Sequence, residues 1–237
     1  MYKKTAKYYD TLYHFLNYSE ASKKLQSIIQ QDNPNAKSLL DVACGTGKHL
    51  ECLRNNYLVE GFDIDPEILE IAHARCPDVP FHQGDMVNLE LTNRFDVVTC
   101  LFSSIACVKT LENLYKSVAR MAFHLKPSGL LLIEPWFYPD NYWVGKVTAN
   151  FVDQQDIKIA WMFITEIEGK VSVYNTHFLV GTPKGIEYVT ERHEYGLFTH
   201  EEYQDAFHRA GLVVKYDSKG LFGGRGNGIY IGKSKSR

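Results

Sequence analysis

LLDVACGTGKHL, residues 39–50, opens on an apolar run that contains one acid, Asp41, and then crosses two glycines, Gly45 and Gly47. A short apolar run that ends at glycines is typical of a buried strand. A glycine-rich turn between a strand and a helix lets a ligand approach the backbone closely. The stretch therefore predicts a strand, a turn and a helix, with a small-molecule site at the turn.

Further apolar runs follow at the spacing of β–α–β units. They are LVEGFDID, VPFHQGDM, FDVVTCLFSS and GLLLIEPW, and helical patterns cover residues 19–31, 48–56, 66–74 and 111–125. Continuous apolar strands alternating with helices predict a parallel sheet with both faces covered. The predicted fold class is α/β, a Rossmann-like sheet with helices on both faces.

The pattern changes after the fifth run. Residues 150–196 alternate between apolar and polar side chains and contain the turns Glu168-Gly169 and Pro183-Lys184-Gly185, which predicts an antiparallel sheet. We expect a single domain over residues 1–237. Within it, residues 36–136 would form the cofactor-binding core and residues 150–196 an inserted, substrate-facing antiparallel layer.

Composition excludes several classes of function. The net charge of −2 comes without a dominant basic patch, so no nucleic-acid partner is expected. No run approaches about 18 apolar residues, so no membrane association is expected. The five cysteines lack zinc-ligand spacing, which predicts reduced thiols, no metal site and a cytoplasmic protein. A monomer and a homodimer both remain open.

Three acids close successive predicted strands: Asp41, Asp63 and Asp85. The carboxyl ends of parallel strands meet at one edge, where ligands bind. At the glycine turn Asp41 would repel a pyrophosphate but attract a cation, such as an amino group beside a sulfonium. Asp63, about twenty residues on, can accept both ribose hydroxyls. Asp85 can accept from an adenine amino group while Met86 packs on the ring.

These residues resemble those of class I S-adenosylmethionine-dependent methyltransferases over about residues 5–136. One departure is Ala43, where that family commonly has a glycine. LLDVACGTGKHL, HQGDM, VTCLFSSI, EPWFYPD and GGRG are similar to motifs of the dTDP-3-amino-3,6-dideoxyhexose N,N-dimethyltransferases of antibiotic deoxysugar pathways. The resemblance implies S-adenosylmethionine as cofactor, a nucleotide-sugar substrate and methylation of its amine.

Residue chemistry and the resemblance together give two sets of binding residues. Those expected at the cofactor are Tyr9, Asp41, Ala43, Gly45, Gly47, Asp63, Ile64, Asp85, Met86 and Phe102. Those expected at the substrate are Tyr18, Trp136 and Arg225. Core packing is the alternative role for Tyr9, Tyr18 and Trp136, and an exposed hairpin turn is the alternative for Arg225.

Two residues are expected to have catalytic roles. His124 ends a helix where the resembling enzymes carry a histidine, and an imidazole with its usual pKa near 6.5 can accept a proton near neutrality. It either takes the proton of the amine or orients the amine, and the structural alternative is a helix-capping or surface histidine. Tyr2 matches a near-terminal tyrosine of those enzymes after a one-residue gap; its alternative is a frayed terminus.

Rival functions stay open. A related methyltransferase could act on another small amine or a hydroxyl. A nicotinamide-dependent oxidoreductase is disfavoured, because no GxGxxG run follows the first strand and Asp41 opposes a pyrophosphate. A non-catalytic S-adenosylmethionine-binding protein is the third alternative.

Overall fold

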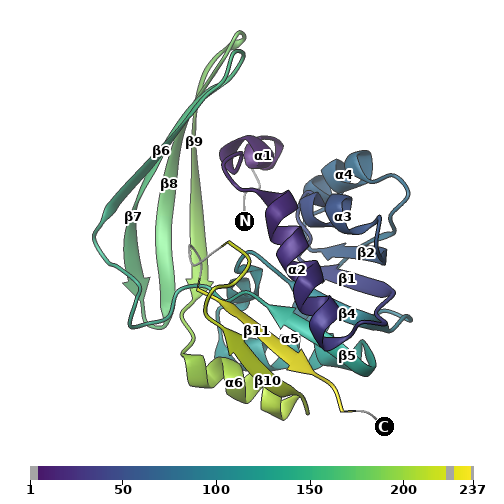
Figure 1. The fold of residues 1–237 in the computed structure, drawn as a ribbon. Coiled ribbons are helices and arrows are strands. Elements are labelled where there is room, and N and C mark those ends of the chain that lie inside the picture. The colour runs from purple at the N-terminus through teal and green to yellow at the C-terminus, as the bar shows by residue number, and fades with distance from the viewer. Residues whose placement is uncertain (1–4, 223–226, 236–237) are drawn as a thin grey trace.

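The structure is a computed structural model that describes residues 5–222 and 227–235, and it contains two β-sheets (Figure 1). The larger sheet has the strand order β10-β11-β5-β4-β1-β2-β3. Its members are β1 (Ser38–Val42), β2 (Leu58–Asp63), β3 (Phe81–Gln83), β4 (Phe95–Cys100), β5 (Leu125–Ile133), β10 (Val213–Asp217) and β11 (Ile229–Lys233). Strands β1 to β5 pair in parallel, and β11 runs antiparallel between β5 and β10.

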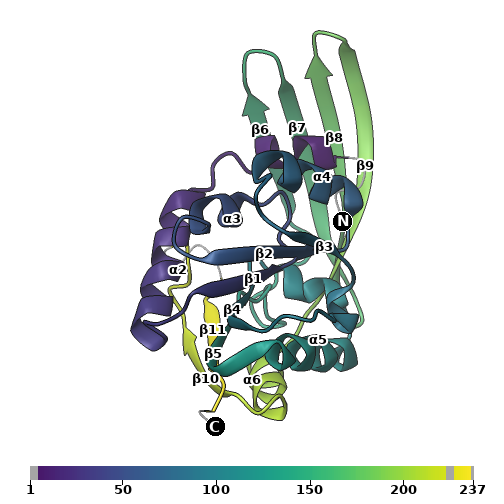
Figure 2. The ribbon, with the colours of Figure 1, turned by 90° about the vertical axis from the view of Figure 1, so that its right-hand side faces the viewer.

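Helices cover both faces of this sheet (Figures 1 and 2). One face packs against α2 (Tyr18–Asp32), α3 (Lys48–Leu53) and α4 (Pro66–Arg75), and the other against α5 (Leu111–Phe123) and α6 (His200–Arg209). The pattern is amphipathic: α5, for example, buries Leu114, Val118 and Met121 at spacings of four and three. Side-chain caps begin most of these helices, such as Thr199 with Glu202 at α6.

The chain reverses its direction of travel across the sheet at β1. Strand β2 pairs with one side of β1 and β4 with the other. A crevice forms at such a reversal beyond the carboxyl ends of the strands, and ligands of open α/β sheets bind there. The fold therefore places the end of β1, and the glycine-rich turn after it, at the binding edge.

The smaller sheet is fully antiparallel. It consists of β6 (Val147–Asp153), β7 (Lys158–Glu168), β8 (Val171–Thr182) and β9 (Gly185–Gly196), paired in chain order. It stands beside the N-terminal segment and rises beyond the larger sheet (Figure 1). Its inner face packs on that segment, η1 (Ala6–Tyr8) and α1 (Tyr9–Leu12), through a cluster of Leu12, Val152, Ile159, Phe178 and Val180.

The expected fold class is confirmed, and one strand boundary differs. The apolar run FDVVTCLFSS predicts a strand to about residue 104, but β4 ends at Cys100. Phe102 and Ser103 adopt positive φ angles, and the 3-10 helix η3 (Ser104–Val108) follows. The apolar character of this run indicates that its residues are buried, but it does not predict their backbone conformation.

No helix among the described residues is both long and apolar enough to cross a membrane.

Candidate active site

The turn after β1 is built from left-handed residues. Ala43, Gly45 and Gly47 have φ angles of 58°, 55° and 76°. A Cβ on Gly47 would lie 3.3 Å from Cβ of Ala72 in α4, so this glycine also allows the turn and α4 to pack closely. Ala43, the departure from the resembling family, carries a left-handed cost of about 1–2 kcal/mol. These left-handed residues and the close packing on α4 fix the backbone of the turn at the binding edge.

Asp41 lies in the sheet just before this turn. It is buried, and its Oδ1 accepts a hydrogen bond of 2.7 Å from Thr99 Oγ1 on β4. Burial raises the pKa of Asp41 to about 7, with a smaller contribution from the nearby carboxylates of Asp63 and Glu134, although the Thr99 hydrogen bond lowers it. An uncompensated carboxylate in this position favours a cationic ligand.

Asp63 ends β2 and holds the same turn. Its Oδ2 accepts from the Gly45 N–H at 2.9 Å, and its Oδ1 accepts from the Asp65 N–H at 3.0 Å. Burial raises the pKa of Asp63 as well. The Ile64 N–H also donates to this carboxylate. Two carboxylate oxygens together accept about four hydrogen bonds, so one acceptor position remains for a ligand hydroxyl.

A cavity of about 270 Å³ opens beside Asp63. Ile64 and Met86 line it with apolar surface, and Asp85 and Asn113 add polar groups. The Ile64 side chain is 64% exposed although it is aliphatic. An exposed apolar residue next to acceptors in a concavity suits a flat ring with polar edges, such as adenine.

Hydrogen bonds and an ion pair hold the N-terminal segment against the glycine turn. Asp10 accepts from Thr46 Oγ1 at 2.7 Å and pairs with Arg75 of α4, and Arg75 also donates to the Thr46 carbonyl. This clamp brings Tyr9 and Tyr18 to a small cavity that Asp41, Ala43 and Gly45 also line. Burial raises the pKa of Tyr9, which keeps its hydroxyl a hydrogen-bond donor near neutral pH.

A third cavity, of about 540 Å³, lies next to this site. One side of it is lined by Glu134, Trp136 and Phe137, and another by the start of α2. Phe102 lines both this cavity and the small one. Trp136 Nε1 donates to Ser172 Oγ on β8 at 2.9 Å, and its ring lies 4.7 Å from that of Tyr195 on β9. Trp136 therefore connects the cavity wall to the antiparallel sheet.

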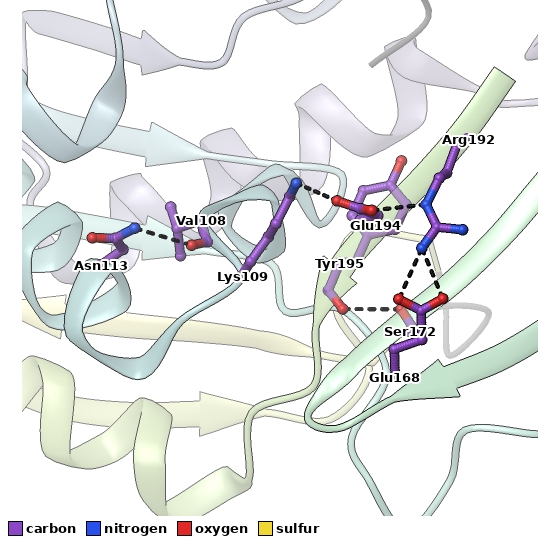
Figure 3. A network of polar contacts seen from close by, with 8 residues as sticks. All are labelled: Val108, Lys109, Asn113, Glu168, Ser172, Arg192, Glu194 and Tyr195. Carbon is purple, nitrogen blue, oxygen red and sulfur yellow. Dashed lines mark hydrogen bonds and ion pairs between the residues drawn. The ribbon is translucent and has the colours of Figure 1, made fainter.

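A chain of polar contacts joins the loop after η3 to the antiparallel sheet (Figure 3). Lys109, which follows η3, pairs with Glu194 on β9, and Glu194 accepts from Arg192 Nε at 2.8 Å. Arg192 in turn donates to both oxygens of Glu168 at the end of β7, at 2.8 and 2.9 Å. Lys109 also lines the cavity of Asp85, so the contact chain begins at the predicted cofactor site.

His124 does not lie with the other candidates. It is fully buried; its Nδ1 lies 2.7 Å from the Arg120 carbonyl, and its Nε2 lies 2.9 Å from the Leu91 nitrogen, whose N–H donates to it. It directly precedes β5, at the amino edge of the parallel sheet. Strand β4 has six residues, which separates the two edges by roughly 16 Å. This placement corrects the expectation that His124 lies beside the amine.

Two other predicted residues, Tyr2 and Arg225, lie outside the described residues. The described neighbours of the second, Phe222 and Asn227, line the 540 Å³ cavity. Among the described residues no group of three or more His, Cys, Asp or Glu side chains is arranged to hold a metal ion.

Sequence reasoning missed three residues at these cavities. Glu134 directly follows β5 and lines the 540 Å³ cavity, His49 lines the small one, and Cys107 lines that of Asp85. Burial lowers the pKa of His49 to about 4 and raises that of Cys107 to about 12, so both are uncharged near neutral pH. Glu134 shows the same sequence pattern as Asp41, an acid at the end of an apolar run, and this pattern could have predicted it.

The residues fit S-adenosylmethionine. Asp41 suits its cationic amino-acid end, the remaining acceptor position of Asp63 suits a ribose hydroxyl, and the cavity of Ile64, Asp85 and Met86 suits adenine. A parallel sheet of this order with such a turn defines the class I methyltransferase fold.

Comparison with known proteins agrees with this class. A family model described as a methyltransferase domain matches residues 39–129. A dTDP-3-amino-3,6-dideoxy-α-D-glucopyranose N,N-dimethyltransferase from Streptomyces fradiae is 37% identical, covering 88% of this chain and 84% of that protein. A dTDP-4-amino-2,3,4,6-tetradeoxy-D-glucose N,N-dimethyltransferase from Saccharopolyspora spinosa is 38% identical, covering 87% and 85%.

Two solved structures extend the agreement over the whole fold. Streptomyces venezuelae DesVI is 35% identical with a TM-score of 0.92, covering 97% of this chain and 98% of that one. CalS10 from Micromonospora echinaspora, an amino pentose methyltransferase with bound S-adenosylmethionine, is 32% identical with a TM-score of 0.85, covering 93% and 92%. The chain belongs to the family of these S-adenosylmethionine-dependent N-methyltransferases, and the expected enzyme class and cofactor are confirmed.

Cofactor affinity should depend on pH through Asp41. With its pKa at about 7, the carboxylate fraction rises from roughly a tenth at pH 6 to nine tenths at pH 8, so binding of S-adenosylhomocysteine should strengthen about tenfold. Because the folded pKa lies above the unfolded value of 3.8, the stability that Asp41 contributes is lost as pH rises from 3.8 to about 7.

Calorimetry at pH 6, 7 and 8 measures this affinity. Asp41→Asn should bind more weakly and show no such rise. A flat wild-type profile, or an equal rise in Asp41→Asn, would remove Asp41 as the titrating group.

His124→Asn should affect stability and leave turnover intact. The shorter amide cannot span Arg120 and Leu91, so a buried N–H loses its acceptor, at about 1–3 kcal/mol. Urea unfolding measures the loss, and kcat per folded enzyme should stay within about twofold. The exposed His208 gives the control, because His208→Asn should change stability by no more than about 0.5 kcal/mol. A hundredfold fall in kcat of folded His124→Asn would return His124 to the chemistry.

Proposed function

We propose that the enzyme N,N-dimethylates the amino group of a dTDP-linked 3-amino-3,6-dideoxyhexose. The observation that carries this proposal is the meeting of two cavities at Phe102. A cavity of about 540 Å³, large enough for a sugar nucleotide to enter, shares this side chain with the cavity at the glycine turn. A methyl acceptor in the first therefore ends beside the cofactor in the second.

The reaction is a direct displacement. The lone pair of the sugar amine forms a bond to the methyl carbon as the bond from that carbon to sulfur breaks, and the amine then loses one proton. Bound S-adenosylmethionine supplies the methyl group as an already reactive sulfonium. The protein's main contribution is to hold the amine in line, which can lower the barrier by about 7–11 kcal/mol in the best-oriented systems.

Proton removal needs no histidine in this proposal. His124 lies at the opposite edge of the sheet. Solvent therefore accepts the proton of the incoming ammonium before it binds. The enzyme then binds the neutral amine. The rate should accordingly follow the neutral fraction of the acceptor.

Four residues are proposed to hold the sugar nucleotide. Trp136 lines the large cavity and would pack on the apolar face of the deoxysugar. Tyr18, near the small cavity, and Arg225, in the GGRG run, would contact the nucleotide and its diphosphate. An arginine can grip a diphosphate by two parallel hydrogen bonds. Tyr2 would bond the amine.

The position of the amine has a second candidate. The relative from Saccharopolyspora spinosa is named for a 4-amino sugar and the one from Streptomyces fradiae for a 3-amino sugar, at 38% and 37% identity. A 4-amino acceptor is therefore the competing substrate. Another small amine or a hydroxyl is the more distant alternative.

The remaining proposals concern organisation. The chain acts as one domain in which residues 150–196 face the substrate. All five cysteines are free thiols, which favours a reducing cytoplasm, and the net charge of −2 gives no reason for a nucleic-acid partner.

We also propose a homodimer rather than a monomer. Phe151, Ala160, Leu179 and Tyr188 form one row across the four antiparallel strands on the face away from the N-terminal segment. Phe151 and Tyr188 are each 65% exposed and Leu179 is 50% exposed, and contiguous apolar patches mark association sites. Light scattering should give the mass of two 27.2-kDa chains; a one-chain mass would exclude the dimer.

Mass spectrometry of products tests the substrate. The enzyme and isotopically labelled donor are incubated with matched dTDP-3-amino and dTDP-4-amino deoxysugars and with a hydroxyl analogue. We expect two methyl groups on the 3-amino acceptor and little transfer to the others. A preference for the 4-amino acceptor would move the activity to the competing substrate, and methylation of the hydroxyl analogue alone would defeat the proposal.

Arg225→Lys serves as the matched variant. It keeps the charge but loses the two-pronged grip, so KM for the nucleotide-sugar should rise while affinity for S-adenosylhomocysteine stays unchanged.

A further inference from the structure

The turn after β4 holds two consecutive non-glycine residues in a left-handed conformation. Phe102 has a φ of 50° and Ser103 a φ of 63°. Each costs about 1–2 kcal/mol, and such costs persist only where surrounding contacts hold the backbone in place. Backbone strain of this kind clusters at functional sites, so the contacts that hold this turn are candidates for a functional role.

The turn places Phe102 at the meeting point of the two cavities. Its side chain lines both of them. Its ring also lies 5.1 Å from that of Tyr13 in the N-terminal segment and 6.2 Å from that of Phe222. The position of this ring therefore shapes both the cofactor side and the acceptor side.

Residues at the end of β5 hold the turn. Glu134 Oε2 accepts from the Phe102 N–H at 2.8 Å, and Ser103 Oγ donates to the Pro135 carbonyl at 2.8 Å. The N–H of Leu221 also donates to the Glu134 carboxylate. One buried carboxylate thus joins the strained turn to the C-terminal segment that forms another wall of the large cavity.

We propose that Glu134 is a positioning residue that holds Phe102 against the Leu221 segment and so sets where the acceptor amine lies relative to the methyl group. This inference rests on the proposed function, because it assigns the large cavity to the acceptor. Glu134 acts here through Phe102 and Leu221; it does not act as a base on the amine. Its commitment to two backbone N–H groups and its 6% exposure agree with that role.

Glu134→Gln is the first test. The amide keeps one acceptor oxygen but turns an NH₂ group toward one of the two N–H donors, so one contact is lost. We expect kcat to fall at least tenfold, because a misplacement of about 1 Å can cost as much as 10²-fold. Affinity for S-adenosylhomocysteine should change by less than about threefold.

Asp96→Asn is the matched control. Asp96 also accepts backbone N–H bonds, from Lys37 and Ser38 at 3.0 and 2.9 Å, but it lies at the amino edge of the sheet. It should lower stability and leave kcat per folded enzyme unchanged.

A second pair of variants isolates the strain. Ser103→Gly and Ser103→Ala both remove the hydroxyl, but only glycine relaxes the left-handed residue. In the Glu134→Gln background, Ser103→Gly should recover at least half of the lost kcat on a logarithmic scale, and Ser103→Ala should recover none. Melting temperatures of the two double variants should differ in the same direction without any acceptor present.

The outcomes are separable. Equal effects of Ser103→Gly and Ser103→Ala, or a wild-type kcat in folded Glu134→Gln, would overturn the positioning role. If Glu134→Gln does not fold, Glu134→Asp replaces it: the shorter carboxylate keeps the charge but draws back from Phe102, so a kcat near wild type would overturn the proposal. Absence of methyl transfer by the wild type to any aminosugar would instead defeat the proposed function.

Discussion

Desolvation of carboxylates at the carboxyl edge of the parallel sheet is the constraint on which the site depends. Asp41, Asp63 and Glu134 lie at the carboxyl ends of three of its strands, and burial raises the pKa of each. Their mutual repulsion is costly unless a cation arrives or hydrogen bonds compensate. Thr99, the Gly45 amide and the Phe102 amide supply part of that compensation. A sulfonium and an ammonium would supply the rest, so the charge of this edge complements that of its ligand.

The same carboxylates explain how much could be predicted from the sequence. Asp41 and Asp63 can be identified from the sequence because each lies in the last two residues of its strand, and chain direction alone puts such residues at the binding edge. Glu134 obeys the same rule and was overlooked. His124 was placed at the site by its likeness to a family position, yet it precedes β5, so the rule assigns it to the amino edge. Its neighbours there, Arg120 and Leu91, confirm that assignment.

Other features depend on contacts between distant parts of the chain and carry no local signal. Asp10 reaches Thr46 and Arg75 across 36 and 65 positions, and Thr5 donates to Glu191 across 186. The left-handed Phe102 and Ser103 lie in an apolar run that predicts a strand. In each case tertiary contacts override the local pattern, since a few hydrogen bonds and buried rings outweigh a propensity of about 1 kcal/mol.

The separate walls of the two cavities bear on the order of events in a double methylation. Apart from Phe102 the large cavity and the small cavity share no lining residue, and Thr46, which Asp10 binds, lines only the small one. Spent cofactor can thus leave by release of the N-terminal segment while the singly methylated sugar keeps its contacts with Trp136 and the α2 side of the large cavity. If the large cavity holds the acceptor as proposed, both methyl groups would be added before the sugar leaves, and the opening of the clamp, a motion that commonly takes microseconds to milliseconds, would set the interval between the two transfers.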